Sequence, residues 1–100
     1  MSFSEFTQRD YEVIARNYAE LKEAARKRCS GEQELAVVQK AFDFANEAHK
    51  NVRRRSGEPY ILHPIAVAKI VVNDIGLGYK AIAAALLHDV VEDTDYTVDD

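Results

Sequence analysis

The sequence contains few of the residues that interrupt or cross-link a chain. Among its 100 residues are one cysteine, two prolines, four glycines and no tryptophan. The single Cys29 excludes an internal disulfide, which fits a reducing compartment. Scarce glycine and proline beside abundant alanine favour helix. The length and a hydrophobic fraction of 47% are ordinary for one globular domain, or a piece of one, with a real core.

Two further absences restrict location and partners. No apolar run reaches the ~18 residues of a membrane-spanning helix, and residues 1–5 do not have the character of a signal peptide. The net charge of −4 leaves no overall basic field for nucleic acid. We therefore expect a cytoplasmic protein that binds neither DNA nor a membrane.

Apolar residues recur at three- and four-residue spacing in most of the chain, which predicts an all-α fold. The expected helices cover residues 7–28, 32–50, 64–74 and 79–93, and residues 51–62 form the main loop between them. Thr7 with Asp10, and Ser30 with Gln33, have the spacing of N-terminal helix caps.

Two aromatic or imidazole features of the first two helices have structural interpretations. The stripe that includes Tyr11, Tyr18 and Leu21 is interpreted as core packing and not as a surface for stacking bases. His49 lies at the C-terminal end of its helix, where the helix dipole favours a histidine. A structural or capping role for His49 is therefore preferred over metal binding.

The segment 86–95 carries the most chemistry. If it is helical, His88 and Glu92 share one face, and Asp89 and Asp93 share the neighbouring face. So much charge beside an apolar run indicates a cation or a substrate that balances it. The alternative is a core helix with a solvated acidic end, although acidic residues there oppose the helix dipole.

Three residues are candidate ligands for one metal ion. His63 precedes Pro64, which is favoured in the first turn of a helix, so we expect His63 at the N-cap of the third helix. The helix dipole there favours the neutral imidazole that a metal requires. With His88 and Asp89 it forms a mixed nitrogen and oxygen set that suits Mn²⁺, Fe²⁺ or Zn²⁺.

A basic loop accompanies these ligands. Residues 53–55 are three consecutive arginines, and arginine binds phosphate in planar, bidentate geometry. A solvated charge run is the alternative interpretation. Taken with a metal that activates water and with Glu92 and Asp93 to orient or deprotonate it, Arg54 and Arg55 as phosphate ligands indicate metal-dependent phosphoester hydrolysis.

The segments 54–64 and 86–94 resemble the N-terminal HD-type hydrolase domain of the RelA/SpoT homologues, the enzymes that make and destroy (p)ppGpp. The resemblance extends over about residues 35–100. It implies an all-α HD-domain helical bundle, of which this chain would form the N-terminal part with about four helices. It also implies a Mn²⁺-dependent guanosine-3′,5′-bis(diphosphate) 3′-pyrophosphohydrolase of the stringent response, which converts (p)ppGpp to GDP or GTP and pyrophosphate.

The resemblance also implies the roles of individual residues. The expected Mn²⁺ ligands are His63, His88 and Asp89, the expected catalytic pair is Glu92 and Asp93, and the expected nucleotide-binding residues are Arg54, Arg55 and Ser56. Because the acidic pair is present, the resemblance implies a hydrolase-competent parent protein. Whether that parent also has GTP pyrophosphokinase activity is left open by the sequence.

The chain departs from the family pattern in two ways. Asn51-Val52 stands where the family often has Gly-Gln, and the family's fourth metal ligand is an aspartate further along than Asp100. We therefore expect a fragment with a leading helix at 1–30 and motif-bearing helices at 31–100. We expect it to be inactive by itself and able to self-associate through uncovered apolar surface.

Two other functions are consistent with the same residues. One is an HD phosphohydrolase that acts on a different nucleotide. The other is a non-catalytic regulatory domain that retains a relic pocket. The intact pair Glu92 and Asp93 argues against the second, because a relic site has no physical need for that charge.

Overall fold

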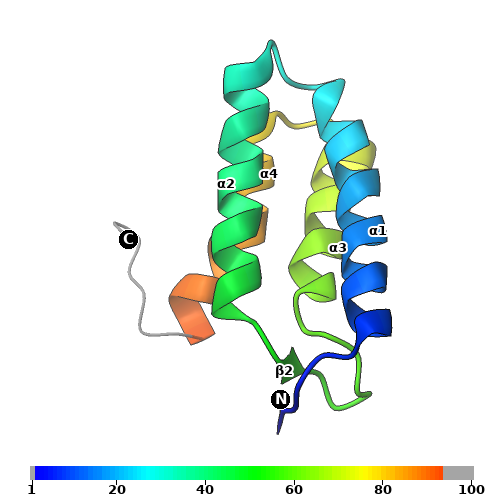
Figure 1. Cartoon of the computed structure of the whole chain (residues 1–100). Helices are drawn as coiled ribbons and strands as arrows, with labels where there is room; N and C mark the ends of the chain where they lie inside the picture. The colour runs from blue at the N-terminus through cyan, green and yellow to red at the C-terminus, as the bar shows by residue number, and fades with distance from the viewer. Residues whose placement is uncertain (1, 94–100) are drawn as a thin grey trace.

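The computed structural model describes residues 2–93, apart from the side chains of Ser2, Asp89 and residues 91–93. It is a bundle of four α-helices (Figure 1), which confirms the all-α class. The helices are α1 (Gln8–Arg26), α2 (Glu32–Ala48), α3 (Leu62–Ile70) and α4 (Tyr79–Asp93). A short π-helix, η1 (Val71–Ile75), continues α3.

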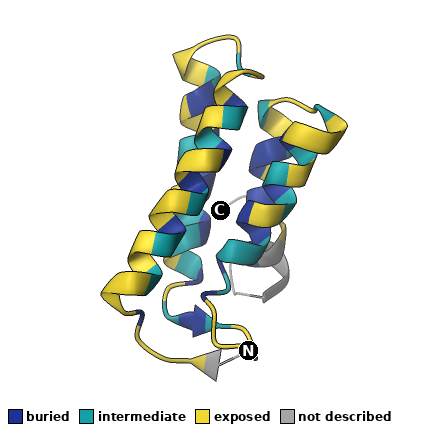
Figure 2. Cartoon of the chain, turned by 90° about the vertical axis from the view of Figure 1, so that its right-hand side faces the viewer, coloured by how far each residue is buried: buried dark blue, intermediate teal, exposed yellow. Residues whose placement is uncertain are grey.

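The core lies between the helices. Helix α4 packs against both α2 and α3, and α1 covers α3 and α2 from the other side. Figure 2 shows the buried residues on the faces that the helices turn toward one another. The largest of the fully buried apolar side chains are Leu21, Ile61, Ile65, Ile82 and Leu86. Burying each contributes about 1.5–3 kcal/mol, so the α3–α4 pair that carries the candidate ligands is firmly packed.

The start of α1 confirms one predicted cap. The backbone N–H of Asp10 donates to Thr7 Oγ1 at 3.2 Å, and the N–H of Thr7 donates to Asp10 Oδ2 at 2.8 Å. Tyr18 is buried and stacks on Phe42 with 3.8 Å between ring centroids, as the core interpretation requires. Tyr11 is 47% exposed, so its assignment to the core is wrong. Its ring packs edge-on against Phe6 of the preceding segment.

Two helix starts differ from the sequence prediction. The N-cap of α2 is Gly31, without a side-chain cap, and the N–H of Ser30 donates to Glu34 Oε1 at 2.9 Å instead. The capping box predicted at Ser30 is therefore absent. Helix α3 begins at Leu62, so His63 lies in its first turn and not at its N-cap.

The third predicted helix also changes type along its length. It is α-helical only to Ile70 and continues as the π-helix η1. Gly76 ends η1 with a φ of +80°, in the left-handed region that glycine adopts without steric cost. The exposed fractions of Ile70, Ile75 and Leu77 are 51%, 60% and 45%, so this end of the bundle presents apolar side chains to solvent. No helix among residues 2–93 combines the length and apolar character needed to cross a membrane.

A small sheet was not predicted. Strand β1 (Ser2–Phe3) pairs antiparallel with β2 (Val52–Arg53), and the N–H of Ser4 donates to Asn51 O at 2.9 Å. Asn51 has a φ of +64°, a left-handed conformation that asparagine tolerates better than most residues. Its side-chain Oδ1 also accepts from the N–H of Phe6 at 3.0 Å. Asparagine thus keeps a conformation suited to glycine and adds a bond to the N-terminal segment.

Candidate metal and nucleotide site

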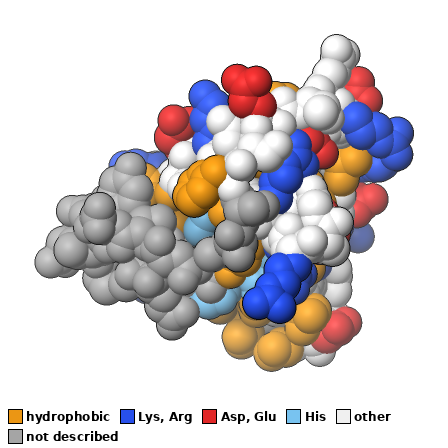
Figure 3. Space-filling model, turned by 90° about the horizontal axis from the view of Figure 1, so that it is seen from below, with side chains coloured by type: hydrophobic (Ala, Val, Ile, Leu, Met, Phe, Trp, Pro, Cys, Tyr) orange, Lys and Arg blue, Asp and Glu red, His pale blue; other side chains and the backbone are white. Residues whose placement is uncertain are grey.

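The two candidate histidine ligands lie side by side. His63 is in the first turn of α3 and His88 is in α4, and the packing of these helices brings their ring centroids to 6.3 Å. Tyr60 lies 5.8 Å from His63, and His49 lies 5.0 Å from Tyr60. Four rings therefore form a row from the interior to the surface. Figure 3 shows histidine side chains reaching the surface at the lower end of the bundle.

His49 is the buried end of this row. It follows the last residue of α2, its backbone N–H donates to Ala45 O at 3.0 Å, and its side chain is almost fully buried. This burial agrees with the structural role expected from the sequence. Its distance from the surface sets it apart from His63 and His88.

A backbone contact fixes the tautomer of His88. Its Nδ1 lies 2.6 Å from the carbonyl oxygen of Ala85. A carbonyl can only accept, so Nδ1 carries the proton, and in the neutral ring the lone pair is on Nε2. Histidines that bind metals commonly donate their other ring N–H to a carbonyl in this way. His88 therefore has the protonation pattern of a ligand that binds through Nε2.

The distance between the two rings is close to the largest that two ligands of one metal ion can have. A metal about 2.1 Å from a ring nitrogen lies about 3.2 Å from the ring centroid, so two ligands of one ion have centroids at most about 6.4 Å apart. The observed 6.3 Å is within that limit for a nearly linear arrangement, and a tetrahedral angle at the metal requires the rings to approach each other by about 1 Å. The described side chains contain no group of three such ligands. The third predicted ligand, Asp89, has its side chain outside the described part.

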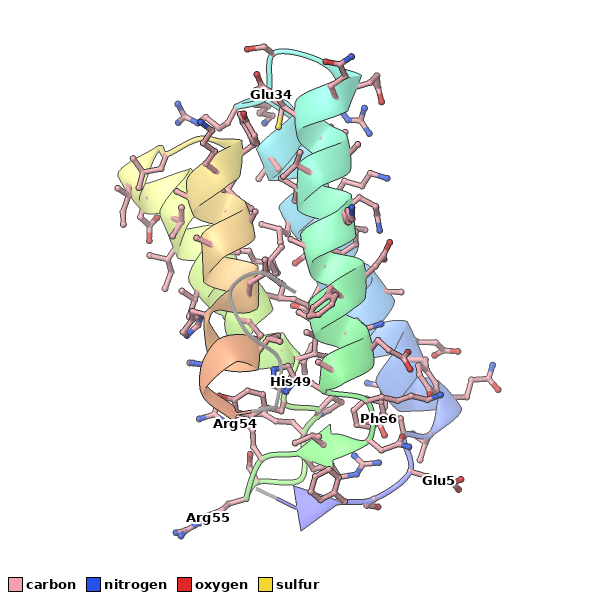
Figure 4. All side chains as sticks on the ribbon, turned by 90° about the vertical axis from the view of Figure 1, so that its left-hand side faces the viewer. Glu5, Phe6, Glu34, His49, Arg54 and Arg55 are labelled. Carbon is pink, nitrogen blue, oxygen red and sulfur yellow. The ribbon has the colours of Figure 1, made fainter. Side chains whose placement is uncertain are left out.

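The predicted nucleotide-binding residues line one pocket. Arg54, Arg55, Ser56 and Tyr60 line an open pocket of about 400 Å³. Figure 4 shows Arg54 and Arg55 at the end of the bundle where His49 follows the last residue of α2. Both arginines are exposed, and the contact of Arg54 Nη1 with Glu58 Oε1 is long, at 3.5 Å. Such an exposed ion pair contributes little to the stability of the fold, and it leaves the guanidinium of Arg54 available to bind a phosphate.

The turn that carries these residues is closed by its own backbone. We call residues 54–58 the arginine loop. The N–H of Arg54 donates to Glu58 O at 2.9 Å, and the N–H of Gly57 donates to Arg54 O at 2.8 Å. Gly57 has a φ of +94°, which only glycine adopts readily. The loop is therefore a defined turn, although its side chains are exposed.

Tyr60 connects the pocket with the histidines and was not predicted from the sequence. It lines the pocket and also packs beside His63. The structure thus brings together two predicted histidine ligands and the three predicted nucleotide-binding residues. Glu92 and Asp93 have their backbone in the last turn of α4, and their side chains lie outside the described part. The sequence could have indicated Tyr60 as a site residue, because it is an aromatic residue three positions before His63.

A comparison with known protein families shows which family this helical bundle belongs to. The model of the HD domain family matches residues 41–100, which include the arginine loop and both candidate histidines. The chain belongs to the HD domain family. An HD hydrolase domain implies a divalent metal ion, and His63 and His88 are the described residues whose spacing fits one.

Its homologues within that family are of the RelA/SpoT type. The chain is 44% identical over 68 residues to a guanosine-3′,5′-bis(diphosphate) 3′-pyrophosphohydrolase of Aquifex aeolicus, covering 68% of this chain and 10% of the relative. It is 46% identical over 63 residues to the bifunctional (p)ppGpp synthase/hydrolase RelA of Mycobacterium tuberculosis, covering 63% and 8%.

A third relative has a different name. The chain is 51% identical over 65 residues to a probable GTP pyrophosphokinase of Mycobacterium leprae, covering 65% of this chain and 8% of that protein. The chain therefore spans at most a tenth of the length of these three relatives.

Proposed function

We propose that the full-length protein is a Mn²⁺-dependent (p)ppGpp 3′-pyrophosphohydrolase, which releases pyrophosphate and GDP or GTP. The observation that carries the proposal is the pocket of Arg54, Arg55 and Ser56, which Tyr60 joins to the pair His63 and His88. A phosphate-binding surface beside two metal-competent imidazoles is what hydrolysis of a pyrophosphorylated nucleotide needs. The names of the relatives support this substrate.

Each residue has a proposed role. His63, His88 and Asp89 hold the metal ion, which when bound supplies Lewis acidity and lowers the pKa of a bound water. Arg54 and Arg55 bind phosphate oxygens, and the Ser56 hydroxyl contacts the nucleotide. Glu92 and Asp93, one helical turn beyond the ligands, orient the attacking water and accept its proton.

The proposal also includes a position for this chain within the full-length enzyme. We assign residues 1–100 to the N-terminal part of an HD-type hydrolase domain, with a leading helix at 1–30 and the motif-bearing helices at 31–100. The family match at 41–100 lies within the second of these segments. We place the enzyme in the cytoplasm and in the stringent response, where (p)ppGpp acts. A GTP pyrophosphokinase activity in the same protein is suggested by the name of the M. leprae relative.

The substrate proposal is tested with a panel of nucleotides. Full-length protein with Mn²⁺ is incubated separately with guanosine tetraphosphate, guanosine pentaphosphate, GTP and ATP, and turnover is measured for each. We expect turnover only with the two 3′-pyrophosphorylated nucleotides. Preferred hydrolysis of GTP or ATP would instead favour an HD phosphohydrolase of another nucleotide, and binding without any turnover would favour a regulatory domain.

The metal site is tested by replacing His88. His88→Ala should abolish the binding of Mn²⁺, which is measured by atomic emission, and should also abolish turnover. Lys50→Ala, at an exposed position two residues beyond the C-terminal end of α2, is the control and should change neither. Full metal content in His88→Ala would show that His88 is not a ligand.

A further inference from the structure

Arg53 differs from its two neighbours in the arginine run. Its side chain is only 14% exposed, whereas Arg54 and Arg55 are exposed. The guanidinium also lies over the ring of Phe6, 5.3 Å from the ring centroid. The three consecutive arginines therefore do not form one uniform basic surface.

The donors of Arg53 are used within the protein. Nη2 donates to Asp10 Oδ2 at 2.7 Å and to the carbonyl oxygen of Glu5 at 2.6 Å. Nη1 donates to the carbonyl oxygen of Gly57 at 2.9 Å. One side chain thus joins α1, the N-terminal segment and the arginine loop. Figure 4 shows Glu5 on one side of β2 and Arg55 on the other.

The carboxylate of Asp10 compensates the charge of Arg53. The Asp10 side chain is 17% exposed, and this pair is much more protected than the Arg54–Glu58 pair, in which each side chain is 47% exposed. The hydrogen bond from Arg53, with a smaller contribution from the Thr7 backbone, lowers the pKa of Asp10 below its usual value. A guanidinium already neutralised and bonded in this way is poorly suited to bind a phosphate as well.

The bond to Gly57 reaches the pocket. Gly57 follows Ser56 directly and closes the turn by donating to Arg54 O. Holding the Gly57 carbonyl therefore restrains the residues that line the pocket on both sides of the turn. The backbone of Arg53 is held as well, because it pairs with Ser2 in the small sheet and forms a β-bridge with Pro59.

We propose that Arg53 is a positioning residue that holds the arginine loop in its nucleotide-binding conformation, and that Asp10 keeps Arg53 in place. The inference rests on the proposed function and deepens it, because it divides the three arginines into one that positions and two that bind. A third phosphate ligand is the alternative role for Arg53. The two roles predict opposite effects of removing the Asp10 charge.

The test uses Arg53→Lys and Asp10→Asn in the full-length protein. Lysine keeps the positive charge but loses the planar fork, so it cannot make the three bonds together. Asp10→Asn leaves Arg53 intact and removes its neutralising partner. Thr7→Ala is the matched control, because it removes the other half of the α1 capping box without touching Arg53.

The first measurement is hydrogen exchange of residues 54–59 in the nucleotide-free protein. Arg53→Lys and Asp10→Asn should each accelerate exchange of the Arg54 and Gly57 amides about tenfold, whereas Thr7→Ala should not. Unchanged exchange in both variants would overturn the proposal. Because this measurement involves no substrate, it decides the positioning role even if the nucleotide panel disproves the proposed function.

The second measurement is the steady-state kinetics with guanosine tetraphosphate. Arg53→Lys and Asp10→Asn should each raise KM about tenfold, with kcat within about twofold of wild type. A lower KM in Asp10→Asn would show that Arg53 binds the nucleotide directly. A fall in kcat at constant KM, as expected for a smaller folded fraction, would reduce Arg53 to a purely structural residue. Either result would overturn the proposal.

Discussion

At the scale of single residues, His88 has the most specific geometry of the candidate site. Its Nδ1 donates to Ala85 O, and the centroid of its ring lies 6.3 Å from that of His63. The sequence predicted both histidines as ligands from their residue type and neighbours. It could not predict the tautomer, because that depends on a backbone carbonyl one helical turn earlier. Nor could it separate Arg53 from Arg54, since two of the three partners of Arg53, Glu5 and Asp10, are more than 40 residues away.

The role of Glu92 can be separated from metal binding. Glu92→Gln removes a proton acceptor and keeps the size of the side chain. We expect kcat to fall by about 10²–10⁴, while the Mn²⁺ content of the purified full-length protein stays near that of wild type. Loss of metal in this variant would make Glu92 a ligand and contradict the assignment.

The role of Arg54 and Arg55 is tested by binding. A charge-assisted hydrogen bond contributes about 1.5–3 kcal/mol, so Arg54→Ala should raise KM for guanosine tetraphosphate about tenfold or more. Arg55→Ala should act in the same direction. If KM is unchanged in both single variants and in the double variant, the arginines are solvated and do not line a nucleotide site.

At the scale of elements, α1 is attached to the other helices by polar as well as apolar contacts. Lys69 of α3 donates to Glu20 of α1 at 2.6 Å. The Tyr18 hydroxyl donates to Gln39 of α2 at 3.1 Å. The sequence predicted the helices within a few residues, since their apolar periodicity is local. The two-residue strands have no periodicity to detect, and they form only because residues 2–3 meet residues 52–53.

The contribution of Tyr18 to the α1–α2 contact is expected to be lost at high pH. Burial, with a smaller contribution from the charge of Asp43, raises the pKa of Tyr18 to about 12. Its ordinary value is about 10, so the neutral form is favoured by folding. Its contribution to stability is complete below pH 10 and is lost as the pH rises toward 12.

The alkaline prediction is measured by denaturant unfolding between pH 9 and pH 12. The free energy of unfolding of wild type should fall over the upper part of this range. Tyr18→Phe should show a smaller fall, because its ring cannot ionise. Parallel pH profiles of the two proteins would contradict a buried, protonated Tyr18.

At the scale of the whole molecule, two ion pairs among the described residues connect α1 to the remainder of the chain. Asp10 pairs with Arg53, and Glu20 pairs with Lys69. The hydrogen bond from Arg53 lowers the pKa of Asp10, and the hydrogen bond from Lys69 lowers that of Glu20. The self-association expected from uncovered apolar surface stays a prediction, which sedimentation velocity of the purified chain can test.

These two carboxylates predict acid sensitivity. A lowered pKa in the folded state means that each pair stabilises the fold above the unfolded pKa of about 4 and loses this contribution as the pH falls through the folded value. The free energy of unfolding should therefore decrease below about pH 4. Asp10→Asn should flatten this decrease between pH 4 and pH 2. An equal slope in wild type and variant would show that the Asp10–Arg53 pair does not stabilise the fold.

The account depends most directly on the reaction itself. Full-length protein is incubated with guanosine tetraphosphate and Mn²⁺, and the products are separated by anion-exchange chromatography. We predict GDP and pyrophosphate in equal amounts, with no product after chelation of the metal or in His88→Ala. Release of orthophosphate, or turnover that persists without metal, would contradict a metal-dependent 3′-pyrophosphohydrolase.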